Sequence, residues 1–114
     1  MESLAQVPKI RILTAEASDQ NVYTLGEGRI TIGRSGENAI VLQDSLVSRR
    51  HAELEFDGEH VLLRDCGGKN PIRVNGSEVQ DYRLLHGDRI SIGHTELLFE
   101  YPPSAPRSPL RVVR

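Results

Sequence analysis

The sequence is poor in cysteine and in long apolar runs, and each shortage excludes a class of protein. A single cysteine, Cys66, can form neither an intramolecular disulfide nor a zinc site of its own, and a reducing compartment is the simplest expectation. No run approaches the roughly eighteen apolar residues of a membrane span, and the N-terminus lacks a basic segment followed by an apolar one. We therefore expect a soluble cytoplasmic protein, or the cytoplasmic part of a larger protein, with no membrane insertion.

Positive charge is also scarce. Fourteen lysines and arginines stand against sixteen aspartates and glutamates, which gives a net charge of -2 and a pI near 6.1. General nucleic-acid binders depend on a strong positive field, so this balance argues against a nucleic-acid partner. The pair Arg49 and Arg50 has no basic helix or aromatic stacking face beside it, and such pairs are more often solvated surface residues.

Catalytic and metal-binding patterns are missing as well. The histidines, at positions 51, 60, 86 and 94, do not have the spacing of metal ligands. Cys66 stands before two glycines with no base or oxyanion signature visible, which is typical of an inert thiol. We expect no enzymatic activity, no metal and no cofactor.

What the sequence does contain is a series of short strands. It has no tryptophan, three tyrosines and two phenylalanines, so the core must be built from isoleucine, leucine and valine, which favour strands. His51 to Phe56 shows the period of two clearly, with Ala52, Leu54 and Phe56 predicted to face inward. Strands are predicted at Lys9–Thr14, Val22–Leu25, Arg29–Gly33, Ala39–Leu42, His51–Phe56, Glu59–Asp65, Ile72–Val74, Ser77–Val79, Arg89–Ile92 and Thr95–Tyr101.

Turn signals separate these strands at intervals of about ten residues, which is typical of an antiparallel sandwich. Asp57-Gly58 and Asn75-Gly76 predict type I′ hairpins, and residues 26–28 predict a glycine-bearing hairpin. The 114 residues suit one domain, which we place at 9–101. Residues 1–8 are interpreted as a flexible arm and residues 102–114 as a proline-rich tail or linker.

Three polar clusters fall between the predicted strands, and we expect them to converge at one end of the sandwich. They are Gly33-Arg34, the segment from Ser48 to His51, and Lys69-Asn70. Together they supply a guanidinium, a hydroxyl, amide donors and glycines that allow a ligand close to the backbone, which are the groups that hold a phosphate. The sequence therefore predicts a phosphate-binding rim made of three loops.

These clusters resemble the motifs of the forkhead-associated (FHA) domain, in the family's order and with its spacing. The resemblance covers about Arg11 to Tyr101, and its motifs are Gly33-Arg34, Ser48-Arg49-Arg50-His51, residues 65–70 (DCGGKN), Val74-Asn75-Gly76 and residues 85–93 (LHGDRISIG). It implies an all-β, FHA-type antiparallel β-sandwich of about eleven strands. It also implies loops that bind phosphothreonine in an extended peptide.

The resemblance assigns roles to individual residues. Arg34 and Ser48 would contact the phosphate, Asn70 would hold the peptide backbone, and Gly33 and His51 would shape the loops. Asn75 and Gly76 are further candidates for shaping loops. A guanidinium can meet phosphate oxygens with two parallel N–H bonds, and an asparagine amide can both accept from and donate to a peptide group.

Three positions differ from the family's usual residues. Lys69 stands where a hydroxyl residue is common, Pro71 stands where glycine is common, and Arg49 replaces a small polar residue. Lys69 and Arg49 would add charge beside the site, and we include both among the candidate phosphopeptide contacts. Pro71 removes an amide and stiffens its turn.

Two functions remain open at this point. The first is a phosphothreonine-peptide recognition module that mediates protein–protein interaction downstream of a Ser/Thr kinase. The alternative is a structural FHA-like domain that binds partners independently of phosphate. All four threonines (Thr14, Thr24, Thr31 and Thr95) lie in predicted strands, so a phosphothreonine ligand is expected from another protein, or from a part of a longer chain outside these 114 residues.

Overall fold

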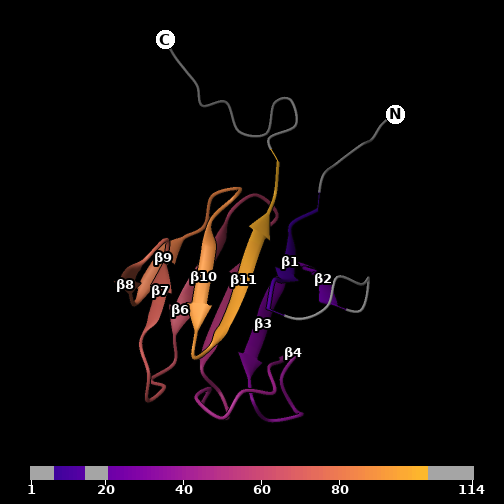
Figure 1. Cartoon of the computed structure of the whole chain (residues 1–114). Coiled ribbons are helices and arrows are strands. Elements are labelled where there is room, and N and C mark those ends of the chain that lie inside the picture. Colours follow the sequence, from indigo (N-terminus) through magenta and orange to yellow (C-terminus); the bar gives the residue numbers. More distant parts are fainter. Residues whose placement is uncertain (1–6, 15–20, 103–114) are drawn as a thin grey trace, which may run out of the picture.

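The computed structural model describes residues 7–14 and 21–102, and within them the chain forms eleven strands and no α-helix (Figure 1). Most of the expected N-terminal arm and proline-rich tail lies outside the described residues. The strands are β1 (Lys9–Ile12), β2 (Val22–Thr24), β3 (Gly28–Gly33), β4 (Ile40–Val41), β5 (Ala52–Phe56), β6 (Val61–Asp65), β7 (Ile72–Val74), β8 (Ser77–Val79), β9 (Asp81–Arg83), β10 (Arg89–Ile92) and β11 (Thr95–Glu100).

The strands form two sheets that pack as a sandwich. One sheet has the order β2-β1-β11-β10-β7-β8 and the other the order β4-β3-β5-β6-β9. Of the pairs whose register is defined, all are antiparallel except β3 with β4, which run parallel because the loop at 34–39 returns the chain before β4 begins. The predicted all-β sandwich is confirmed, with this one parallel pair as a difference in detail.

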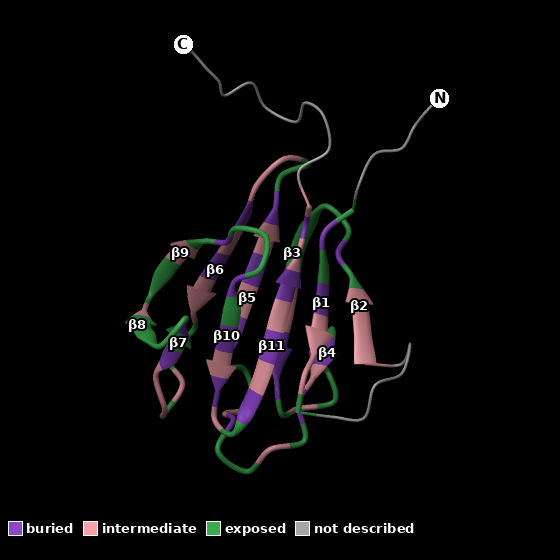
Figure 2. Cartoon of the chain, turned by 45° about the horizontal axis from the view of Figure 1, so that its top comes forward, coloured by how far each residue is buried: buried purple, intermediate pink, exposed green. Residues whose placement is uncertain are grey.

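The core lies between the sheets and is mainly aliphatic, as the composition predicted (Figure 2). On β5 the residues Ala52, Leu54 and Phe56 are buried, which confirms the inward face inferred from the alternation. The outward glutamates pair with arginines on neighbouring strands, as Glu53 does with Arg29 at 3.3 Å. Pairs of this kind, in which at least one partner is open to solvent, contribute about 1 kcal/mol each, so burial of the aliphatic face supplies most of the stability.

The predicted hairpin at residues 26–28 is wrong. β2 pairs with β1 in one sheet, whereas β3 pairs with β5 in the other, so this connection crosses between the sheets. Leu25 explains the crossing: its N–H donates to the Pro8 carbonyl at 2.9 Å and its side chain is buried in the core. Local glycine content cannot reveal this, because a hairpin and a crossover need the same flexible residues.

The two remaining turn predictions have different outcomes. Asn75 and Gly76 have φ values of 52° and 89°, and Val74 pairs with Ser77, so the type I′ hairpin is confirmed. At Asp57-Gly58 only the glycine has a positive φ, and four residues separate the paired Phe56 and Val61. The reason is the Asp57 carboxylate, which accepts the N–H groups of residues 59 and 60 at 2.8 and 2.7 Å and stabilises a wider turn.

The sequence patterns also missed β9. Only the middle residue of Asp81–Arg83 is partly buried, and the strand lies at a sheet edge beside β6, so it has no apolar alternation to detect.

None of the described segments is a helix that could span a membrane. Lys9 and Glu100 pair at one end of the sandwich, where both chain ends leave (Figure 1). The long loops gather at the opposite end.

Candidate functional site

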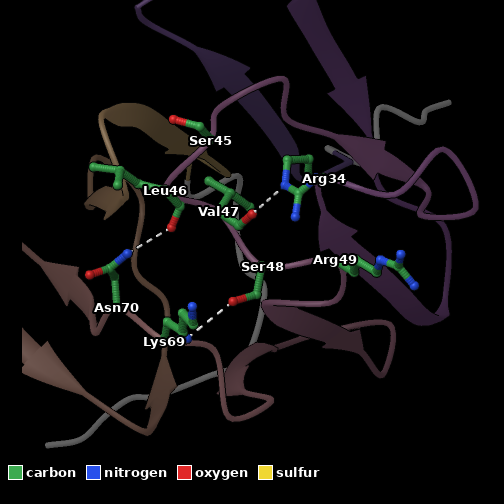
Figure 3. A pocket seen from close by; sticks show the side chains of 8 residues that line it. All are labelled: Arg34, Ser45, Leu46, Val47, Ser48, Arg49, Lys69 and Asn70. Carbon is green, nitrogen blue, oxygen red and sulfur yellow. Dashed lines mark hydrogen bonds between the residues drawn. The ribbon is translucent and has the colours of Figure 1, made fainter.

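The three polar clusters of the sequence do meet at the end where the long loops gather. Arg34 follows the last residue of β3, Ser48 lies in the loop before β5, and Asn70 lies in the loop between β6 and β7. They border one open pocket of about 310 Å³ (Figure 3). Its lining residues are Arg34, Ser45, Leu46, Val47, Ser48, Arg49, Lys69 and Asn70.

Arg34 is held at the rim by two bonds to the neighbouring loop. Its backbone N–H donates to the Ser48 carbonyl at 3.0 Å, and its Nε–H donates to the Val47 carbonyl at 2.9 Å. Within the described residues no protein acceptor takes its two terminal nitrogens, and the residue is exposed. The guanidinium is therefore positioned through Nε while both terminal groups remain able to bind an anion.

Ser48 is oriented by the loop that carries Lys69. The Ser48 Oγ accepts the Lys69 backbone N–H at 3.1 Å. Because this bond uses an oxygen lone pair and leaves the hydroxyl proton unused, Ser48 can donate its O–H to a ligand. The side chain thus joins two loops and still presents a donor to the pocket.

His51 links the same two loops through its buried ring. The ring is fully buried, its Nδ1 accepts the Ser48 N–H at 3.0 Å, and its Nε2 lies 2.7 Å from the Asn70 carbonyl. An acceptor at Nδ1 requires the proton at Nε2, so these contacts fit the neutral ring with Nε2–H donating to Asn70. His51 therefore fixes Ser48 and Asn70 relative to each other.

Two glycines leave space for these contacts. A Cβ at Gly68 would lie 2.6 Å from the His51 ring, too close for any real side chain. A Cβ at Gly33 would overlap the Arg49 carbonyl and lie 2.8 Å from the Asn38 Nδ2. Asn38 itself donates through Nδ2 to the carbonyls of Ser35 at 2.8 Å and Arg49 at 2.6 Å. Glycine is therefore required at position 33 because a larger residue would collide with the Arg49 carbonyl. Gly68 and Asn38 were not singled out from the sequence.

The other predicted peptide contacts, Asn70, Lys69 and Arg49, all border the pocket, but their side chains point in different directions (Figure 3). Asn70 donates Nδ2–H to the Leu46 carbonyl at 2.8 Å and directs its amide oxygen away from that bond (Figure 3). Lys69 borders the pocket beside Ser48. Arg49 also borders it, but its side chain extends away from Ser48 and past Arg34 (Figure 3).

The structure does not bring Asn75 and Gly76 to the pocket. They lie at the end of β7 that is remote from Asn70 and form the β7–β8 hairpin. The Asn75 side chain donates to the Asp88 carboxylate at 2.9 Å and accepts the Arg89 N–H at 3.0 Å. Their shaping effect is on this distant turn.

Asp44 is a positioning residue that the sequence analysis missed. Its carboxylate accepts the Leu46 N–H at 2.9 Å, and the His94 N–H and Thr95 hydroxyl at 2.8 Å each, which fastens the Ser48 loop to the β10–β11 turn. Partial burial alone would raise the pKa of Asp44, but these donors favour the anion and the net shift is downward. An aspartate two residues before an N–H that it accepts is a recognisable turn signal, whereas its bond to Thr95 is not readable locally.

Metal-ligating groups and the single cysteine were also compared with the site. Among the described residues no group of three His, Cys, Asp or Glu side chains could hold a metal ion. The Cys66 backbone N–H donates to the His51 carbonyl at 3.0 Å, but desolvation and the nearby Glu53 raise the pKa of the Cys66 thiol, which lowers its reactivity.

Comparison with known proteins identifies the family to which this chain belongs. Residues 30–93, more than half of the chain, match the sequence family described as FHA domain. The chain belongs to the FHA family. It is 42% identical over 76 residues to the FHA domain-containing protein FhaA of Mycobacterium tuberculosis, a match that covers 67% of this chain and 14% of FhaA. It is 34% identical over 83 residues to the glycogen accumulation regulator GarA of Mycolicibacterium smegmatis, covering 73% of this chain and 52% of GarA.

A solved structure supports the same assignment. It comes from a structural and functional analysis of phosphothreonine-dependent FHA domain interactions, and it superimposes with a TM-score of 0.79 at 34% identity. The match covers 86% of this chain and 99% of that structure. This FHA chain thus matches nearly all of that solved structure, but it spans at most about half the length of the curated relatives named above.

Proposed function

We propose that this FHA domain binds threonine-phosphorylated peptides of partner proteins and has no catalytic activity of its own. The observation that carries the proposal is the convergence of Arg34, Ser48 and Asn70 on one pocket, with the first two retaining unused donors. The similar structure was studied for phosphothreonine-dependent interactions, which supports the same ligand here.

The phosphate is bound through charge and donor geometry. Phosphothreonine carries about -1.5 to -2 charges and three acceptor oxygens. The terminal nitrogens of Arg34 can donate two parallel bonds, while the Ser48 hydroxyl donates to a further oxygen. Hydrogen bonds to charged groups contribute about 1.5–3 kcal/mol each, so Arg34 supplies a large part of an affinity in the micromolar range.

Asn70 provides the second anchor. Its amide oxygen is directed outward because Nδ2 is held by the Leu46 carbonyl, and it can accept a backbone N–H of an extended peptide. Lys69 lies beside Ser48 and adds positive charge at the pocket border. The ligand is thus recognised by its phosphate and by its main chain next to the phosphothreonine.

The phosphothreonine comes from another protein or from a part of a longer chain outside these 114 residues. Thr95 is buried and donates to Asp44, and Thr31 lies on β3 and accepts the Ala39 N–H at 3.1 Å. Modification of such strand residues would disturb the sandwich before it produced a ligand. A Ser/Thr kinase therefore acts upstream and phosphorylates the partner. We place this binding in the cytoplasm, a reducing compartment in which a free thiol such as Cys66 persists.

The decisive experiment compares Arg34→Ala with Arg83→Ala. Arg83 is also an exposed arginine, but it lies on β9 away from the pocket. Binding of a phosphothreonine peptide and its unphosphorylated twin is measured by isothermal titration. We expect Arg34→Ala to weaken phosphopeptide binding by about 100-fold or more and Arg83→Ala to leave it unchanged.

The alternative function has its own signature in this experiment. Both variants must keep the circular dichroism and melting behaviour of the folded wild type. Equal affinity of the wild type for the phosphorylated and unphosphorylated peptides would exclude phosphate recognition and favour a phosphate-independent interaction domain. Unchanged binding by Arg34→Ala would remove Arg34 from the site.

A further inference from the structure

Most of the arginines on strands are paired with carboxylates, and Arg83 on β9 is the exception among the described residues. Arg11, Arg29, Arg64, Arg73 and Arg89 lie on strands, and each has a carboxylate within 3.5 Å. At the rim, no carboxylate of the described chain forms an ion pair with Arg34, Arg49, Arg50 or Lys69. The rim of this chain, whose net charge is -2, thus carries positive charge that no ion pair of the described residues compensates.

This charge exceeds what the phosphothreonine pocket uses. Arg34 and Lys69 border the pocket with Ser48 and Asn70. Arg49 borders this pocket too, and together with Arg50 it also borders a second, adjoining pocket of about 190 Å³, which is completed by Ser35, Glu37 and Asn38. Arg49 extends to the side of Arg34 and Ser48 that faces away from Asn70 (Figure 3).

The second pocket is built on a fixed backbone. The Arg49 carbonyl accepts the Asn38 side-chain amide at 2.6 Å and the Ser35 N–H at 3.2 Å, so the backbone at Arg49 is anchored inward. The Ser35 Oγ accepts the Glu37 N–H at 3.2 Å and keeps its own O–H available to donate. Two guanidinium groups and a hydroxyl donor therefore border the same small space.

We propose that the Arg49–Arg50 pocket is a second anion subsite, which reads an acidic side chain of the phosphopeptide on the side of the phosphothreonine opposite to that held by Asn70. The inference rests on the proposed function and names its ligand class: phosphothreonine peptides with carboxylates on one flank. A phosphate on that flank has the same recognition chemistry and more charge.

Glu37 provides an internal check on this assignment. It is the one carboxylate bordering the second pocket, and it forms no ion pair with either arginine in the described structure. Its charge opposes an incoming anion, so neutralising it strengthens the subsite. Glu37→Gln and the double variant Arg49→Gln/Arg50→Gln therefore change acidic-peptide binding in opposite directions.

The test uses four phosphothreonine peptides, with neutral flanks, with three glutamates before the phosphothreonine, with three glutamates after it, and with a phosphoserine on the preferred flank. Affinities are measured at low salt for the wild type, Glu37→Gln, Arg49→Gln/Arg50→Gln and the control Lys9→Gln/Arg83→Gln. The control removes two exposed cations from positions away from the rim. All four proteins are checked for unchanged melting.

We expect glutamates on one flank to tighten wild-type binding by about 3- to 10-fold, and phosphoserine by more, with the gain falling as salt is added. The gain disappears in Arg49→Gln/Arg50→Gln, persists in the control and increases in Glu37→Gln. Peptide identity distinguishes carboxylate from phosphate as the anion.

The proposal and the function on which it rests can fail separately. If the neutral phosphopeptide does not bind the wild type, the proposed function itself is wrong. If it binds but glutamates add nothing on either flank, or the gain survives in the arginine double variant, the subsite is refuted. A loss that is equal for neutral and acidic peptides would assign these arginines to the phosphothreonine and would also overturn the second subsite.

Discussion

His51 offers the sharpest test of how the scaffold holds the rim, and the change to make is His51→Ala. The ring is fully buried, and both nitrogens are engaged, one with the Ser48 N–H and the other with the Asn70 carbonyl. Truncation leaves these two backbone groups without partners, at about 1 kcal/mol or more each. It also leaves a cavity where the ring was, at about 2 kcal/mol or more.

The expected loss is therefore about 3–5 kcal/mol of unfolding free energy, a large part of the 5–15 kcal/mol typical of such domains. Phosphopeptide affinity falls as well, because Ser48 and Asn70 lose their fixed separation. The matched control is His60→Ala, since His60 is only half-buried and lies in the β5–β6 turn. We expect the control to change stability by less than about 1 kcal/mol and to bind normally.

Unfolding is followed in urea by circular dichroism, since the protein has no tryptophan. Binding is measured by titration at a temperature where both variants are folded. If His51→Ala unfolds within about 1 kcal/mol of the wild type and binds the phosphopeptide equally well, then the ring does not connect the two loops energetically. The structural account of the rim would then be wrong.

Three further predictions separate rim from scaffold. Gly68→Ala places a Cβ 2.6 Å from the His51 ring, so we expect the unfolding free energy measured in urea to fall by about 1–3 kcal/mol and phosphopeptide binding to weaken. An unchanged affinity would contradict the tight contact. Asn75→Ala removes the bonds to Asp88 and Arg89 at the remote turn, so melting should show a stability lower by about 1–3 kcal/mol. Titration should show a phosphopeptide affinity within twofold of the wild type. Asp44 has a lowered pKa, so its stabilisation is present above its unfolded pKa of about 3.9 and is lost as pH falls through the lower folded value. Asp44→Asn should therefore be less stable by about 1 kcal/mol at pH 7, with the difference vanishing on acid titration; a gap that persists in acid would exclude the charged bonds as its cause.

Several elements of the fold were predictable because their signals are local. The period of two placed Ala52, Leu54 and Phe56 inward, and Asn75-Gly76 encoded a turn through the positive φ that its two residues tolerate. β9 failed because an exposed edge strand needs no apolar alternation, and the crossover at residues 26–28 failed because a flexible segment does not indicate which sheet the next strand will join.

The candidate site divides in the same way. The sequence by itself supplied the chemical groups of the rim, since a guanidinium, a hydroxyl, an amide and small residues can be read one position at a time. Only the tertiary structure decided which of these groups meet. It places Arg34, Ser48 and Asn70 around one pocket and Asn75 at the remote end of the sandwich. It also shows that the loops of the rim are supported by Asp44, Asn38 and Gly68. The physical reason is that residue type fixes what a side chain can donate or accept, whereas distances between loops depend on the register of strands far apart in the chain.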